Sequence, residues 1–271
     1  MAAGQLFKKE MRMRLAMFLI VSLIGFAATA EAKVVGSMVP YSNGGVELAG
    51  YIAYDDSIEG KRPGVLLVHE WWGLNDYVRM RADQLAGLGY VAFAADMYGK
   101  GKVTENPQEA SAWAQALRGD IGLLNRRATA GLDVLKADPR TDVTRIAAIG
   151  YCFGGGAVQH LAYSGAPLKG IVSFHGGFVN PSGDEAKAVK AKILICHGAA
   201  DSFSTPQAMQ DYIAAMEQAG LDWQMVIFGG AKHAFTNPNV DKAGLEGVAY
   251  SKSADERSWK YMKDFFDEIF H

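Results

Sequence analysis

One glycine-rich segment of the sequence places a cysteine where a nucleophile would be exposed. The segment contains Gly150-x-Cys152-x-Gly154 and directly follows an apolar run, residues 145–149. A strand that turns sharply into a helix holds the central residue of such a motif in a strained conformation, so the flanking positions must be small. The dipole of the following helix favours the thiolate. The motif predicts a nucleophilic cysteine, although a glycine-rich turn can also simply pack or cradle a phosphate.

Two further polar residues follow predicted strands later in the chain. Asp201 comes after the apolar residues 192–196, and His233 comes after residues 222–228. The order nucleophile, acid, histidine is that of the α/β-hydrolases. In such a triad His233 accepts the thiol proton, or pairs with the thiolate as imidazolium, while Asp201 orients the ring. Asp96 also ends a predicted strand and is the alternative acid, but the chain order favours Asp201.

A nucleophilic cysteine also needs donors for the oxyanion that forms on the substrate. In the α/β-hydrolase arrangement these are backbone N–H groups, one after the nucleophile and one in the loop after an earlier strand. The sequence places Phe153 directly after Cys152 and Trp71 shortly after the apolar residues 65–68. We therefore expect the N–H groups of Phe153 and Trp71 to form the oxyanion hole.

The elements that must position these residues alternate between strands and helices. An N-terminal antiparallel hairpin is predicted from residues 37–42 and 46–54, which are joined by Asn43-Gly44-Gly45. Continuous apolar runs predict buried strands at residues 65–68, 90–95, 145–149, 169–174, 192–196 and 222–228. Helical patterns lie between them, at residues 76–88, 107–136 with an interruption near 119–120, 153–163, 205–219 and 247–270. The pattern predicts an α/β-hydrolase fold, with a mostly parallel, doubly wound sheet and helices on both faces.

The N-terminus has the layout of a secretory signal peptide. Four basic residues precede an apolar stretch, residues 15–28, and small residues then allow cleavage after Ala30 or Ala32. The stretch is shorter than the ~20 residues that a membrane-spanning helix needs. We expect residues 1–32 to be removed, residues 33–271 to form a single domain, and the protein to be exported to the periplasm without stable membrane insertion. An uncleaved anchor is the alternative, and translation could start at Met11 or Met13.

Composition excludes several classes of protein. The 271 residues are 49% hydrophobic and 21% charged, which is not the composition of a disordered chain. Lys and Arg total 27 against 29 Asp and Glu, so there is no basic excess for binding nucleic acid. His residues lack the spacing of a metal site, and no cofactor motif is present.

Two cysteines in an exported protein raise the possibility of a disulfide. Cys196 lies inside an apolar strand and is expected to be a core residue. If residues 169–174 form a strand between the two cysteine-bearing strands, the separation exceeds the ~7 Å limit for a disulfide. Thiol redox chemistry is also disfavoured, because Cys152 has no CxxC partner.

At these residues the sequence resembles the dienelactone hydrolase family. The resemblance rests on five segments in order: HEWWGLN from His69, ADMYG from Ala95, GYCFGG from Gly150, HGAAD from His197, and HAF from His233. It implies a hydrolase of small carboxylic esters or lactones, in the EC 3.1.1 class, with a triad of Cys152, Asp201 and His233. It also implies that Glu70 hydrogen-bonds the resting thiol and takes part in its activation.

One departure from the family concerns the charge of the substrate. Family members that act on anionic dienelactones carry arginines near the site, one of them shortly after the catalytic histidine. Residues 234–238 contain no arginine, and Lys100 and Lys102 are the basic residues after Gly99. Whether the substrate is anionic therefore stays open.

The remaining candidates have structural interpretations. We expect Arg79 and Arg81 to form a solvated helix face and His160 to lie away from the chemistry. His69, His175 and His197 each end a strand, and structural hydrogen bonds are their expected role. Trp71, Trp72 and Tyr151 could form an apolar wall for the substrate or belong to the core.

Two functions remain to be compared. The first is a cysteine hydrolase with a small-molecule ester or lactone as its substrate. The alternative is a non-catalytic exported protein that binds a ligand on the hydrolase fold. The oligomeric state is not indicated by the sequence.

Overall fold

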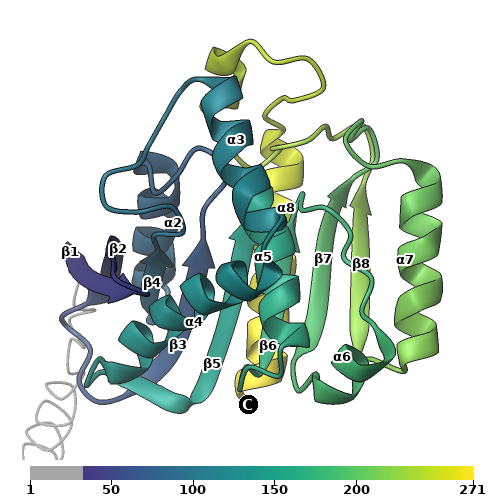
Figure 1. Cartoon of the computed structure of the whole chain (residues 1–271). Coiled ribbons are helices and arrows are strands. Elements are labelled where there is room, and N and C mark those ends of the chain that lie inside the picture. The colour runs from purple at the N-terminus through teal and green to yellow at the C-terminus, as the bar shows by residue number, and fades with distance from the viewer. Residues whose placement is uncertain (1–32) are drawn as a thin grey trace, which may run out of the picture. The chain divides into compact units, whose positions relative to one another are not determined.

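An eight-stranded sheet organises residues 33–271, the part of the chain that this computed structural model describes (Figure 1). The strands lie in the order β1-β2-β4-β3-β5-β6-β7-β8. The predicted signal peptide, residues 1–32, lies outside the described residues.

The sheet begins with the antiparallel hairpin that the sequence predicts. β1 (Val34–Asn43) pairs with β2 (Val46–Asp55) so that Asn43 is opposite Val46. Gly44 and Gly45 form the two-residue turn, both with positive φ, which is the backbone of a tight hairpin turn. β2 then pairs antiparallel with β4 and joins the hairpin to the rest of the sheet.

The other strands are parallel to one another, as their continuous apolar runs predict. They are β3 (Arg62–Val68), β4 (Val91–Ala95), β5 (Thr141–Tyr151), β6 (Gly170–Phe174), β7 (Lys192–Gly198) and β8 (Trp223–Phe228). Strands buried on both faces need helices on both sides, because side chains alternate between the two faces. The mostly parallel sheet confirms the predicted α/β-hydrolase fold.

Helices cover the two faces and enclose two hydrophobic cores. α2 (Asp76–Gly87) and α8 (Lys252–Phe270) pack on one face. The other face carries α3 (Pro107–Arg118), α4 (Ile121–Ala137), α5 (Phe153–Tyr163) and α7 (Pro206–Ala219). Two short elements escaped the sequence analysis, α6 (Gly183–Ala188) and the 3₁₀ helix η2 (Val240–Ala243), because each is too short to show a period.

The last helix starts later than expected, at Lys252 rather than near residue 247. Gly247 has a positive φ of 80°, which a helix does not permit. The next residue, Val248, forms a β-bridge with His233. The backbone of residues 247–248 therefore contacts the loop that carries His233, and the helix begins after this segment.

The carboxyl ends of the parallel strands form the edge at which the predicted site should lie. In Figure 1 the arrowheads of these strands point toward the top of the view, where α3 and the yellow-green segment around η2 lie. Both cysteines are free, and β6 separates the strands that carry them, which agrees with the expected absence of a disulfide. Within residues 33–271, none of the helices is both long enough and apolar enough to cross a bilayer.

Candidate active site

Cys152 lies at a sharp turn between β5 and α5. Its φ of 53° is in the left-handed region, which a residue with a side chain rarely adopts. The turn is made possible by its glycine neighbours, because a Cβ on Gly150 would collide with the backbone of Gly154. A Cβ on Gly154 would in turn collide with the backbone of Val68 in β3. The G-x-C-x-G spacing thus lets strand, turn and helix approach closely and leaves the cysteine half-buried at the sheet edge.

His233 and Asp201 meet at the same edge, after β8 and β7. His233 Nδ1 lies 2.8 Å from Asp201 Oδ2. The other oxygen of Asp201 accepts a hydrogen bond of 2.9 Å from the N–H of Phe203. Because both oxygens are engaged and the carboxylate is buried, Asp201 can hold the imidazole in one orientation with Nε2 turned away from the acid.

The surroundings of His233 favour its charged form. Burial by itself lowers the pKa of His233, but the charge of Cys152 and hydrogen bonds with Asp201 and Cys152 outweigh burial and raise the pKa to about 10. A negative charge on the thiol stabilises an imidazolium beside it. The pair is therefore arranged for proton transfer between sulfur and imidazole.

Glu70 is a buried carboxyl group that lines a cavity together with Cys152 and His233. Its Oε2 accepts a hydrogen bond of 2.7 Å from Asn237 Nδ2. Burial raises the pKa of Glu70 to about 7, although Asn237, His233 and Arg81 each act to lower it. Glu70 can therefore exist in both charge states near neutral pH.

Two other strand-end residues are occupied with structural bonds. His69 contacts the carbonyl of Glu70 through Nδ1 and accepts the N–H of Met97 at Nε2. Asp96 accepts backbone N–H groups of Ala49, Tyr98 and Gly99. The alternative in which Asp96 is the triad acid thus has no support, since His233 contacts Asp201. The structural role expected for His69 agrees with its contacts.

The predicted oxyanion donors belong to the segments that follow β5 and β3. Phe153 is the first residue of α5, so its N–H has no partner within the helix. Trp71 follows β3 and lines the cavity together with Glu70 and Cys152.

Two adjoining cavities, each of about 300 Å³, meet at Cys152. We call the first the His233 chamber; its walls include Glu70, Trp71, Trp72, His233, Leu245 and Val248. We call the second the Phe178 chamber; its walls include Ile121, Leu124, Gly156, Ala157, Phe178 and Val179. Arg118, Cys152 and Gly177 belong to both.

The chambers correct several expectations. His160 lines the Phe178 chamber, so it is not remote from Cys152. Tyr151 is buried in the core and stacks on Phe174, whereas both tryptophans line the His233 chamber as a substrate wall would. Arg118, at the end of α3, was not identified from the sequence, because a single basic residue in the last turn of a helix resembles an ordinary solvated side chain.

The two lysines suggested in place of the family's arginines lie elsewhere. Lys100 pairs with Glu47, and Lys102 lies over the ring of Trp113. Neither is among the residues that line the two chambers in the described part of the chain. The basic side chain at the cleft is that of Arg118 instead.

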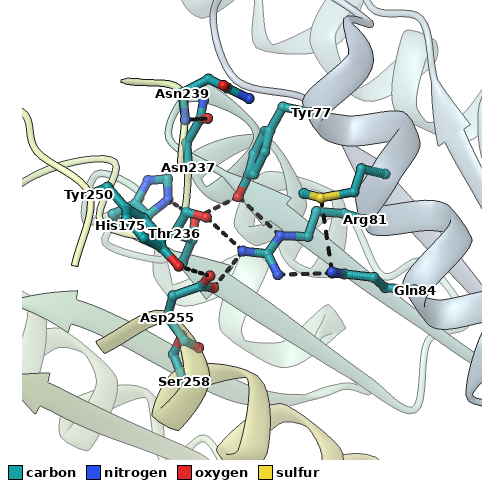
Figure 2. Close-up of polar contacts among 11 residues, drawn as sticks. Tyr77, Arg81, Gln84, His175, Thr236, Asn237, Asn239, Tyr250, Asp255 and Ser258 are labelled. Carbon is teal, nitrogen blue, oxygen red and sulfur yellow. Dashed lines mark hydrogen bonds and ion pairs between the residues drawn. The ribbon is translucent and has the colours of Figure 1, made fainter. Parts of the chain in front are cut away.

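Arg81 is buried, which contradicts the expected solvated face of α2. Its guanidinium donates a hydrogen bond of 2.6 Å to the carbonyl of Thr236 and forms an ion pair with Asp255 of α8 (Figure 2). The rings of Tyr77 and Trp259 lie 5.4 and 5.2 Å from its Cζ. Arg79, two residues earlier on the same helix, is partly exposed, and its only ion pair within residues 33–271 is with Asp76.

This network holds the loop that carries His233 and Asn237. The hydroxyl of Thr236 lies 2.6 Å from both Tyr77 Oη and His175 Nε2 (Figure 2). Ala234, between His233 and Thr236, has a positive φ of 56°. Strained backbone of this kind persists only where its surroundings hold it, so the Arg81 network is what keeps the turn in place.

No metal site is visible in residues 33–271, since no three His, Cys, Asp or Glu side chains gather there as ligands. The residues at the cleft can supply a nucleophile, a base with an orienting acid, and backbone donors.

Comparison with known proteins shows which proteins this chain resembles in sequence and in fold. A model of the dienelactone hydrolase family matches residues 48–270. A relative from Aquifex aeolicus, named "Putative carboxymethylenebutenolidase", is 28% identical over 235 residues, covering 85% of this chain and 97% of its own. A solved structure of a dienelactone hydrolase-like promiscuous phosphotriesterase from metagenomic libraries is 38% identical, with a TM-score of 0.85, and covers 88% of this chain and 99% of its own. A dienelactone hydrolase from Anabaena variabilis, 24% identical with a TM-score of 0.62, covers 85% of this chain and 98% of its own and shares the fold.

Replacing Arg81 should destabilise the protein far more than replacing Arg79. Arg81→Met leaves Asp255 and the carbonyl of Thr236 without their buried partner, which should cost about 3–5 kcal/mol of unfolding free energy. Arg79→Met removes only a surface pair and should cost less than about 0.5 kcal/mol. Urea unfolding of both variants measures the difference, and equal losses would show that Arg81 is not a structural anchor.

Glu70 should make stability fall with rising pH. Its pKa of about 7 in the folded state exceeds the ordinary value of 4.5, so the folded state holds the additional proton between these pH values. The free energy of unfolding therefore decreases as pH rises through this window. Glu70→Gln does not titrate, so its stability relative to wild type should increase by about 3 kcal/mol between pH 4 and pH 8.

Glu185→Gln is the control of opposite sign for that experiment. A backbone hydrogen bond from Ser182 lowers the pKa of Glu185, so the ionised form stabilises the native state. This variant should lose stability relative to wild type as pH rises. Unfolding curves at several pH values would contradict the assignment of Glu70 if both variants changed in the same direction.

Proposed function

The chain belongs to the dienelactone hydrolase family, and from that premise we propose that it hydrolyses small carboxylic esters or lactones through a Cys152-His233-Asp201 triad. The family supports a hydrolase with a small-molecule substrate. The triad and the covalent mechanism are what we propose beyond that.

The observation that carries this proposal is the contact of His233 with Asp201 beside the strained turn of Cys152. The 2.8 Å hydrogen bond between the imidazole and the buried carboxylate leaves the other ring nitrogen for the thiol. The close approach of β5, α5 and β3 imposes the left-handed conformation of Cys152, and the side chain of this residue lines both chambers. Strain concentrated at a cavity is typical of a catalytic nucleophile.

Acylation would proceed as follows. The thiol of Cys152 transfers its proton to His233, and the sulfur attacks the carbonyl carbon of the ester. The carbonyl oxygen becomes an oxyanion, which accepts hydrogen bonds from the N–H groups of Phe153 and Trp71. As the intermediate collapses, His233 donates its proton to the alkoxy oxygen and the C–O bond breaks. The alcohol is released, and the acyl group remains on Cys152 as a thioester.

Deacylation repeats these steps with water. His233 takes a proton from water, and the hydroxide formed attacks the thioester carbon. The C–S bond breaks, the carboxylic acid is released, and the proton on His233 returns to sulfur. Asp201 stabilises the imidazolium in both halves without itself being protonated.

Glu70 gives this site a means of restraining its thiol. A carboxylate in the same buried cavity disfavours a second negative charge on sulfur. With its pKa near 7, Glu70 is charged at mildly alkaline pH and largely neutral at acidic pH. We infer that the resting thiol is kept unreactive when Glu70 is ionised.

We also propose that the enzyme is exported to the periplasm, on the basis of the basic and apolar pattern within residues 8–28. In an oxidising compartment an unprotected thiolate would be oxidised. Restraint of the resting thiol is therefore useful to an exported cysteine hydrolase.

Removal of the nucleophile should abolish turnover. Cys152→Ala should lower kcat/KM on short alkyl esters by at least about 1,000-fold, because no thioester can form. Cys196→Ala is the matched control: this cysteine is buried in β7 and is not among the residues that line the two chambers, so the kcat/KM of the variant should stay within about two-fold of wild type. Ester hydrolysis at equal rates by Cys152→Ala and wild type would reject the triad, and retained ligand binding without turnover would favour the binding-protein alternative.

Neutralising Glu70 should increase the reactivity of Cys152. With Glu70→Gln, alkylation of Cys152 by iodoacetamide at pH 8 should be about ten-fold faster than in wild type, because the variant lacks the nearby carboxylate that disfavours negative charge on the sulfur. The difference should shrink below pH 7, where the wild-type carboxyl is protonated. Mass spectrometry of the labelled peptide separates Cys152 from Cys196. A slower or unchanged rate at pH 8 would contradict the restraint.

A further inference from the structure

The cleft around Cys152 has two chambers, and the catalytic groups are divided between them. His233, Glu70 and Trp71 line only the His233 chamber. Phe153 lines only the Phe178 chamber. Cys152 lines both chambers, so a carbonyl carbon bonded to its sulfur would lie at their junction. The two predicted donors, the backbone N–H groups of Trp71 and Phe153, must both reach the one oxygen of that carbonyl.

Proton transfer decides which half of an ester each chamber receives. The alkoxy oxygen must lie within hydrogen-bonding reach of His233, because the imidazole protonates it as it leaves. His233 borders one chamber only, so the alcohol portion extends into that chamber. The acyl portion, bonded to the same carbon, is directed into the Phe178 chamber.

The walls of both chambers are suited to apolar groups. The Phe178 chamber presents Ile121, Leu124 and Val179, while the His233 chamber presents Trp72, Leu245 and Val248. Arg118 belongs to both, and its guanidinium lies 5.6 Å from the centre of the Phe153 ring, at the junction. Arg118 is thus shared by the two chambers, and the apolar side chains named above line one chamber or the other.

We propose that the substrates are open-chain esters, with an apolar acyl chain in the Phe178 chamber and an apolar alcohol in the His233 chamber. This inference rests on the proposed function. An open-chain ester extends in two directions from its carbonyl carbon, whereas the acyl and alkoxy parts of a small lactone form one ring. A small ring would occupy one chamber and leave the other without contacts.

Gly156 offers a way to fill the acyl chamber without disturbing the fold. It lies in α5, and a Cβ at this position would meet only Val179, at an ordinary contact distance of 3.8 Å. Gly156→Leu would therefore project a side chain into the Phe178 chamber, and leucine favours helix more than glycine does. Leu245→Trp places a larger side chain in the His233 chamber, from the segment between η2 and α8. Gly183→Leu, at an exposed glycine of α6 with open space around it, is the control.

The experiment measures kcat/KM on ethyl acetate, ethyl hexanoate and hexyl acetate. In Gly156→Leu the ratio of ethyl hexanoate to ethyl acetate should fall about ten-fold or more, because each methylene excluded from an apolar pocket costs on this scale. The ratio of hexyl acetate to ethyl acetate should change less than about two-fold. Leu245→Trp should show the reverse pattern, and Gly183→Leu should change neither ratio.

The outcomes separate this inference from the proposed function. Selective loss of the acyl ratio in Gly156→Leu supports the assignment, whereas selective loss of the alcohol ratio, or equal loss of both, overturns it. A higher wild-type kcat/KM for γ-butyrolactone than for ethyl hexanoate also overturns it, while leaving the hydrolase intact. If instead Cys152→Ala were as active as wild type, the triad itself would fail. Should Gly156→Leu not fold, Val179→Trp tests the same chamber from the opposite wall.

Discussion

The close approach of three backbone segments at the Cys152 turn is the constraint on which the rest of the site depends. β5 must reverse into α5 beside β3, and the glycines at positions 150 and 154 leave no room for a Cβ on either. This geometry forces Cys152 into a left-handed conformation and aims its side chain into the cleft. It also makes Phe153 the first helical residue, so that an unpaired N–H lies next to the sulfur. One packing requirement therefore positions both the proposed nucleophile and a proposed donor for the oxyanion.

The histidine side of the site is held by a buried ion-pair network in addition to the β-bridge between His233 and Val248. The loop after β8 contains a positive φ at Ala234 and has little regular structure of its own. Its carbonyl at Thr236 is fixed by Arg81, which Asp255 neutralises from α8. Asn237, on the same loop, reaches across to Glu70. Ionisation of this buried carboxyl group destabilises the folded state. Functional sites often retain local destabilisation of this kind.

These two halves differed in how far sequence could predict them. The strand positions and the hairpin follow from apolar runs and turn residues, which act over short distances. The sequence also shows that Cys152, Asp201 and His233 follow strands, which are β5, β7 and β8 of one sheet. Arg81 could not be assigned in this way. Its burial depends on Asp255, 174 residues further along the chain, whereas the local pattern of α2 shows only a charged residue among other polar ones. Arg118 was not identified from the sequence, and His160 was wrongly expected to lie away from Cys152, for the same reason. Their positions depend on which helices enclose the cleft, and local periodicity does not determine that.

The walls of the cleft come from segments that the sheet does not constrain. Ile121 begins α4 just after α3 ends at Arg118, and Leu245 and Val248 belong to the segment between η2 and α8. Residues in such connections can change without disturbing the strand ends that hold Cys152, Asp201 and His233. The catalytic groups, by contrast, are tied to close backbone contacts and buried ion pairs, which tolerate little change. It follows that in this fold the chemistry and the choice of substrate are controlled by different parts of the chain. The absence of the family's expected arginine after His233 is therefore compatible with intact catalytic groups, because it alters a wall of the cleft and leaves the triad in place.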